Sequence, residues 1–168
     1  MEKKTLARIA MAAVAALALV IWLRPSETKR VRKVFATVSR EIRKDGQEGI
    51  VVATAKARAL AELVATGARF KIDEEILHGV ADGRQLVQQI VLVRGQADKI
   101  EVGFTDIAIA FDDERTASVT ADVFVNGLSS EMGLSGRDAR QLEAVLVKDR
   151  DDGKWRFLSV SLAPVVEK

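Results

Sequence analysis

The spacing of apolar residues changes along the chain, from every third or fourth position to every second position. The first helical repeat consists of five large apolar residues: Val31, Val34, Phe35, Val38 and Ile42. This repeat predicts an amphipathic helix that ends at about Lys44, before Asp45-Gly46. A second, alanine-rich helix is predicted from about Ile50 to Ala65, with Gly67 placed to end it. Its expected apolar stripe has six members: Val52, Ala55, Ala59, Leu60, Leu63 and Val64.

Alternation with a period of two begins after a predicted third helix, which spans about Gly83 to Val93. A short strand precedes that helix around Phe70 and Ile72, and a long strand follows it from Lys99. The long strand carries Ile100, Val102 and Phe104 on one face, and then Ile107, Ile109 and Phe111 on a face shifted by one residue. A β-bulge near Thr105-Asp106 would reconcile the two faces.

The last third of the chain predicts more strands of the same sheet. Alternation over 117–125 and from Leu142 predicts two strands joined by a Gly/Ser loop at 126–136. The acidic segment Asp151-Asp152-Gly153 predicts a turn before a final strand over 155–162. The fold class is therefore α+β, three helices followed by an antiparallel sheet. The predicted core is Phe35, Leu63, Phe104, Phe111, Trp155 and Phe157.

This order of elements, closing on the strand Lys154-Trp155-Arg156-Phe157-Leu158-Ser159-Val160, resembles the nuclear transport factor 2-like (SnoaL-like) superfamily over 29–165. The resemblance implies a cone in which a curved antiparallel sheet wraps around three helices and leaves a pocket. The superfamily includes ketosteroid isomerases, SnoaL-like cyclases and many non-catalytic binding or assembly domains. Fold alone therefore does not assign a function.

Two interpretations of the space between helices and sheet remain open. Small residues within the strand alternations could leave an apolar cavity: Ala108, Ala110, Ala117, Ala121 and Ala144. Alternatively, four large helix-side residues fill the space: Leu60, Leu63, Leu86 and Ile90. We expect the second arrangement.

An uncharged apolar run at 9–23 predicts a membrane anchor. Counting from Leu6 to Leu23, with the arginine at position 8 reaching the headgroups, the helix approaches the ~30 Å hydrocarbon thickness. The predicted organisation is a signal anchor or transmembrane helix at 1–24, a linker at 25–30 and one domain at 31–168. A cleaved secretory signal and a buried soluble helix are the alternatives.

The charge distribution places the basic residues beside this segment. Residues 24–44 hold eight Lys/Arg against two Asp/Glu, a net of +6, whereas residues 45–168 have a net charge of −6. Five of the basic residues are candidates for contact with anionic lipid headgroups: Arg24, Lys29, Arg30, Arg32 and Lys33. An acidic domain argues against nucleic acid as a partner.

Two signals for orientation disagree. The excess of basic residues after the run favours a cytoplasmic domain, but a short basic tail before an apolar run has the layout of an export signal. We expect a single-pass protein of a bacterial inner membrane with a periplasmic domain, and a cytoplasmic domain stays open.

Candidate catalytic residues are few, because the chain has no tyrosine, no cysteine and one histidine. His78, as a general base, and Asp106, re-aimed by the expected bulge, are weak candidates. We expect no cofactor and no metal ion. The expected function is a membrane-tethered, non-catalytic binding or assembly domain, such as a subunit of a bacterial envelope complex with a protein partner or a second copy. The alternative is a SnoaL-like enzyme or a binder of a small apolar ligand.

Overall fold

The computed structural model describes residues 26–72, 75–77, 83–129 and 134–164. The chain divides into units 1–30 and 31–168, and only 26–30 of the first unit are described. The expected anchor at 1–24 and most of the linker at 25–30 therefore lie outside the described residues. None of the helices within the described ranges is long and apolar enough to cross a membrane.

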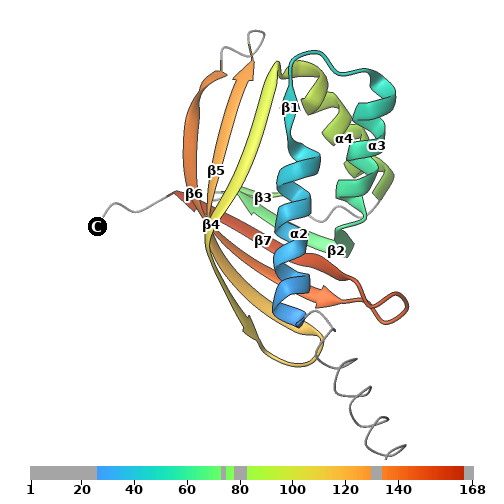
Figure 1. The fold of residues 1–168 in the computed structure, drawn as a ribbon, viewed down its shortest axis with the longest axis vertical. Coiled ribbons are helices and arrows are strands. Elements are labelled where there is room, and N and C mark those ends of the chain that lie inside the picture. The colour runs from blue at the N-terminus through green and yellow to red at the C-terminus, as the bar shows by residue number, and fades with distance from the viewer. Residues whose placement is uncertain (1–25, 73–74, 78–82, 130–133, 165–168) are drawn as a thin grey trace, which may run out of the picture. The chain divides into compact units, whose positions relative to one another are not determined.

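Three helices cover one face of a curved seven-stranded sheet in residues 31–168 (Figure 1). The elements are α2 (Glu27–Ile42), β1 (Lys44–Asp45), α3 (Ile50–Ala61), β2 (Val64–Ile72), β3 (Glu75–Leu77), α4 (Gly83–Gln96), β4 (Lys99–Phe111), β5 (Thr116–Ser129), β6 (Leu134–Lys148) and β7 (Trp155–Pro164). The strand order is β1-β4-β5-β6-β7-β2-β3. Strands β4 to β7 form an antiparallel meander, but β2 runs parallel to β7, so the sheet is mixed and not purely antiparallel as predicted.

Helix α3 ends earlier than predicted, because the chain enters β2 at Val64. Gly67 does not terminate the helix: it lies within β2 at φ +75°, where the register with β7 shifts. The predicted stripe of α3 was right at Leu60, which is buried, but wrong at Val52 and Ala55, which are exposed; the other buried residues are Ala53 and Ala57. Alanine side chains are small and allow α3 to pack closely on α4. The valines in the first turn of α3 are exposed instead.

The predicted bulge in β4 is confirmed. The register between β4 and β5 shifts between Thr105 and Ala108, and Asp106 adopts φ +52°. The predicted loop at 126–136 was wrong, because β5 extends to Ser129 and pairs with β6 from Leu134. Strands pair through backbone hydrogen bonds, so glycine and serine can continue the ladder between β5 and β6. These residues show no alternation of apolar side chains, so the sequence pattern did not predict a strand there.

The core lies beneath the first half of α2, where Val31, Val34 and Phe35 pack on β5, β6 and β7. Trp155 and Phe157 are buried, as predicted, and Leu63 and Phe104 pack partly buried against them. Phe111 is a correction: it is the last residue of β4 and is 42% exposed, and its ring lies 5.9 Å from that of Trp155. Beyond this core, the described side chains leave a space between the helices and the sheet.

Candidate functional site

A cavity of about 480 Å³ lies between the helices and the sheet. Its helical side is formed by α2, α3 and α4, which contribute Val38, Ile42, Leu60, Leu86, Gln89, Ile90, Val93 and Arg94. Strands β2, β4, β5, β6 and β7 supply the opposite side with large apolar side chains, among them Phe104, Leu142 and Phe157. The volume falls in the range of ~300–1,000 Å³ typical of small-molecule sites.

The expectation that large helix-side residues fill this space was wrong. Leu60, Leu63, Leu86 and Ile90 line the cavity and leave it open. The small strand residues do not create the cavity either. Ala108 and Ala110 are exposed, whereas Ala117, Ala121 and Ala144 are packed in the core. The cavity lies between two layers of large apolar side chains.

Three phenylalanines separate the core from the cavity. Phe35, 1% exposed, meets Phe104 edge-to-face with a centroid distance of 5.2 Å and Phe157 with a distance of 5.3 Å. Such pairs contribute about 0.5–1.5 kcal/mol each beyond their buried area. Because Phe104 and Phe157 line the cavity and Phe35 does not, Phe35 holds that part of the wall from the core side.

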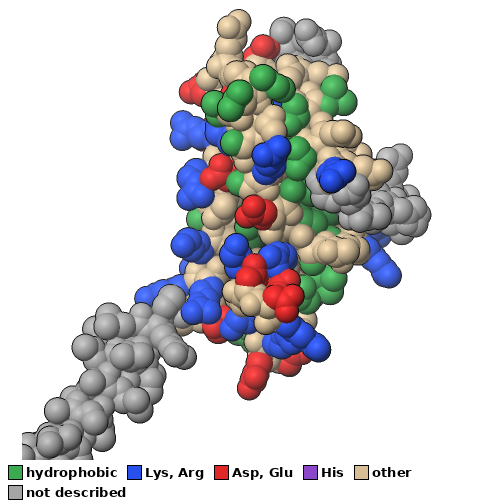
Figure 2. Space-filling model, turned by 90° about the vertical axis from the view of Figure 1, so that its right-hand side faces the viewer, with side chains coloured by type: hydrophobic (Ala, Val, Ile, Leu, Met, Phe, Trp, Pro, Cys, Tyr) green, Lys and Arg blue, Asp and Glu red, His purple; other side chains and the backbone are tan. Residues whose placement is uncertain are grey.

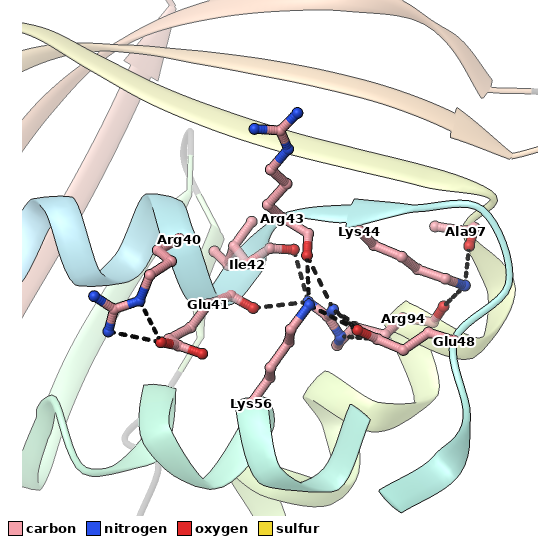
Figure 3. Close-up of polar contacts among 9 residues, drawn as sticks. All are labelled: Arg40, Glu41, Ile42, Arg43, Lys44, Glu48, Lys56, Arg94 and Ala97. Atoms are coloured by element: carbon pink, nitrogen blue, oxygen red, sulfur yellow. Dashed lines mark hydrogen bonds and ion pairs between the residues drawn. The ribbon is translucent and has the colours of Figure 1, made fainter. Parts of the chain in front are cut away.

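Eighteen of the twenty described lining residues are apolar, and the two others are Gln89 and Arg94. Arg94 is 3% exposed, and its guanidinium turns towards a polar cluster at the end of α2 (Figure 3). It donates to both carboxylate oxygens of Glu48 at 2.6–2.9 Å and to the carbonyls of Glu41, Ile42 and Arg43 at 2.6–3.2 Å. These bonds occupy all five N–H groups of an arginine. Arg94 therefore has no donor left for a molecule in the cavity.

Glu48 balances the charge of this cluster. Burial by itself raises the pKa of the Glu48 carboxyl, but hydrogen bonds from Lys56 and Arg94, together with their positive charges, hold its pKa below the ordinary value. Lys56 lies 2.8 Å from Glu48 Oε1 and also donates to Arg43 O at 3.0 Å. The carboxylate therefore stays charged at neutral pH and remains paired with Arg94 and Lys56.

Lys44 completes the cluster from β1. Its ammonium group, on a residue that is 8% exposed, donates to the carbonyl oxygens of Arg94 and Ala97 at the end of α4. Cations at helix C-termini satisfy carbonyls that have no partner in the helix and oppose the helix dipole. The cluster thus joins the ends of α2 and α4 at one end of the cavity wall.

Of the two sequence candidates for chemistry, only Asp106 lies within the described residues. Asp106 is exposed on the bulge of β4 and is absent from the described lining. His78 lies outside the described residues. Across the described ranges, no three His, Cys, Asp or Glu side chains gather to hold a metal ion. The described lining offers no carboxylate, imidazole or free cation, so it suits desolvation of an apolar molecule better than proton transfer.

Comparison with known proteins finds similarity in structure but not in sequence. No protein-family model matches the chain, and no curated protein sequence is significantly similar to it. A scytalone dehydratase-like protein from Novosphingobium aromaticivorans superposes with a TM-score of 0.67 at 15% identity, over 84% of this chain and 95% of that one. The fold is the nuclear transport factor 2-like fold.

Two further solved structures share this fold. A dehydratase-like protein of the NTF2-like family from Streptomyces avermitilis has a TM-score of 0.62 at 14% identity, covering 84% of this chain and 98% of its own. A hexachlorocyclohexane dehydrochlorinase also has a TM-score of 0.62, at 13% identity, covering 84% of this chain and 86% of its own. At such identities the similarity establishes the fold of this chain and no activity.

Proposed function

We propose that residues 31–168 bind a small apolar molecule, such as a hydrocarbon chain or a compact ring system, without transforming it. The observation that carries the proposal is the cavity of about 480 Å³ with eighteen apolar residues among its twenty described lining residues. Burial of apolar surface in such a site contributes about 25 cal/mol per Å² before the entropic costs of binding.

Binding is favoured over catalysis by what the described lining lacks. General acid–base catalysis requires a titratable group within hydrogen-bond reach of the reacting atom. The only charged residue in the described lining is Arg94, and its donors are committed to Glu48 and to backbone carbonyls. The similarity to the dehydratase-like and dehydrochlorinase structures therefore supports the fold of this chain and assigns no reacting group to it.

The membrane tether belongs to the same proposal. The apolar run at 9–23 supports an anchor spanning 6–23, and the basic residues after it support contact with anionic headgroups. In this arrangement the domain works at the surface of a bacterial inner membrane, on the periplasmic side, and passes its ligand to or from a protein partner. The tether raises the local concentration of the domain at that surface.

Photolabelling of the full chain tests the ligand proposal. The chain, reconstituted in lipid nanodiscs, is incubated with an alkyl chain that carries a diazirine, irradiated and mapped by peptide mass spectrometry. We expect labels on peptides that line the cavity, such as those containing Ile90 and Val125. Free reagent recovered after incubation in the dark should have an unchanged mass. Labels confined to the 9–23 segment, or a converted reagent, would contradict the proposal.

A matched pair of variants shows whether the cavity is the labelled site. Val102→Phe adds bulk to a residue of the lining and should reduce labelling of the cavity peptides. Leu158→Phe adds similar bulk to β7 at a side chain that is 38% exposed and absent from the lining, so labelling should not change. Equal labelling in both variants would show that the reagent binds elsewhere.

A further inference from the structure

An apolar surface lies where α3 begins and α4 ends. Three consecutive residues in the first turn of α3, Ile50, Val51 and Val52, are 66%, 79% and 49% exposed. On α4, Leu92 and Val93 are 62% and 52% exposed. Figure 2, which faces the side of α3 and α4, shows hydrophobic side chains at the surface in its upper part. Exposed apolar groups of this kind mark contacts with proteins or membranes.

The two helices bring these residues together at one end of the domain. Ile50 lines a surface depression together with Val91 and Gly95 of α4. Val52 lines a second depression together with Arg40 of α2 and Arg43, the residue that follows α2. The first turn of α3 therefore lies between the last turns of α4 and the basic end of α2. We name the five exposed apolar residues 50, 51, 52, 92 and 93 the α3–α4 apolar end.

Cations outnumber carboxylates in the segment that includes most of α2 and all of α3. Residues 31–61 hold seven Lys/Arg against three Asp/Glu, whereas residues 62–168 hold 13 against 19. Five of the seven cations are exposed: Arg32, Lys33, Arg40, Arg43 and Arg58. Two of them, Arg40 and Arg43, line the depression of Val52. Two exposed carboxylates, Asp45 and Asp98, line the depressions of Val52 and Ile50, respectively. Figure 2 shows lysine and arginine side chains along one edge of the same view. In Figure 3 the Arg43 side chain points away from the Glu48 cluster.

We propose that the α3–α4 apolar end and the cations beside it dock the domain on an anionic lipid bilayer. Shallow insertion of aliphatic side chains combined with attraction of cations to anionic lipid is the usual basis of such contacts. A protein interface is less well matched, because binding hot spots are enriched in tryptophan, tyrosine and arginine, and the apolar end is wholly aliphatic. Val93 belongs both to this end and to the cavity lining, so the cavity would meet the bilayer there. The docking itself stands whether or not the cavity holds a ligand.

A probe at position 51 tests the docking in the full chain. Because the chain has no cysteine, Val51→Cys provides a single site for an environment-sensitive fluorophore. Val51 is absent from the described cavity lining, so the probe leaves the ligand site intact. The labelled chain is reconstituted in vesicles of phosphatidylcholine with and without phosphatidylglycerol. We expect a blue shift of the emission, and quenching by brominated lipid, that are strong only with phosphatidylglycerol.

Two further variants serve as controls. A probe at Thr120→Cys, exposed on β5 away from the helices, should report water in both kinds of vesicle. Arg43→Gln in the Val51→Cys chain should lower the ratio of inserted to water-exposed probe roughly five-fold, as expected for one cation lost near a charged surface. Added salt should weaken insertion in the same direction.

Each remaining outcome overturns the docking. A water-like probe at position 51 in both vesicles, or equal shifts at positions 51 and 120, would exclude it. A shift at position 51 that depends on protein concentration instead of phosphatidylglycerol would assign the apolar end to a second copy or a protein partner. Cavity photolabelling is read out separately, so a failure of docking and a failure of ligand binding are distinguishable.

Discussion

Lys44 and Arg94 cap each other's helices. Arg94, near the end of α4, donates to the last carbonyls of α2, and Lys44, two residues after α2 ends, donates to the carbonyls of Arg94 and Ala97 at the end of α4. The two cations are 3% and 8% exposed, and Glu48 supplies the carboxylate that makes the arginine's burial tolerable. This reciprocal capping ties together two helices that carry much of the cavity wall.

Removal of the arginine tests how much this cluster stabilises the fold. Arg94→Met keeps much of the side-chain volume but removes the arginine's donors from Glu48 and from the carbonyls of Glu41 and Ile42, so Glu48 keeps only its pair with Lys56. We expect a loss of about 3–5 kcal/mol in the free energy of unfolding, measured by urea denaturation. The matched control is Arg40→Met, since Arg40 is 69% exposed and its pair with Glu41 should contribute under ~1 kcal/mol. Similar losses in both variants would mean that the cluster around Arg94 stabilises the fold no more than an exposed ion pair does.

The pH dependence of stability follows from Glu48. Burial raises the pKa of the Glu48 carboxyl, but the hydrogen bonds from Lys56 and Arg94 together with their positive charges outweigh this effect, so the pKa is lowered in the folded state. The unfolded chain therefore takes up protons first as the pH falls, so the stability that the charged carboxylate supplies is complete above its ordinary pKa of 4.5 and is lost below it. We expect the stability gap between the wild type and Glu48→Gln to be constant near neutral pH and to narrow below that value.

The difference in stability between the wild type and Glu48→Gln excludes the pH dependence that other carboxyl groups contribute to both proteins. Backbone hydrogen bonds from Arg115 and Lys154 lower the pKa values of Asp113 and Asp152, respectively, and these groups titrate equally in both chains. Denaturation midpoints measured from neutral pH to below the ordinary pKa of Glu48 give the gap directly. A gap that widens with acidification would reverse the assigned sign.

The sequence predicted the parts of the fold that depend on apolar periodicity. Large apolar side chains at every third or fourth position predicted α2, and such side chains at every second position predicted β4, β5, β7 and the bulge at Asp106. The extension of β5 and β6 through Gly127 and Gly136 could not be seen, because those residues pair through backbone atoms alone. The parallel pairing of β2 with β7 joins segments far apart in the chain, which periodicity does not report.

The cavity and its polar cluster were harder to predict, for two different reasons. Whether Leu60 and Ile90 fill a space or surround it depends on the distance between layers, which side-chain identity does not determine. Arg94 directly follows the predicted third helix, and nothing in the spacing of Lys44, Glu48 and Arg94 along the chain indicates that the three side chains meet. Their burial arises from the packing of α2, α3 and α4, and only the basic residue at a helix end was a signal available beforehand.

Asp106 gives a prediction about the backbone of the bulge. Its φ of +52° lies in the left-handed region, which asparagine and aspartate tolerate and β-branched residues do not. We expect Asp106→Asn to leave the free energy of unfolding nearly unchanged and Asp106→Val to lower it by about 1–3 kcal/mol. Ala108→Val, exposed on the same strand beyond the bulge, is the control and should change stability by less than ~0.5 kcal/mol. Equal effects at positions 106 and 108 would argue against a strained bulge.

The aromatic contacts of Phe35 give the last prediction, which separates stability from binding. Phe35→Leu removes the ring that meets Phe104 and Phe157 edge-to-face, and Trp155→Leu removes a core ring that is absent from the described cavity lining. We expect both variants to lose roughly 1–3 kcal/mol in the free energy of unfolding. Only Phe35→Leu should also weaken photolabelling of the cavity peptides, because Phe104 and Phe157 lose the side chain that fixes their orientation. The measurement compares labelling at a temperature where both variants remain folded by circular dichroism. If Trp155→Leu reduced labelling as strongly as Phe35→Leu, the wall would depend on the stability of the whole core and not on these two aromatic contacts.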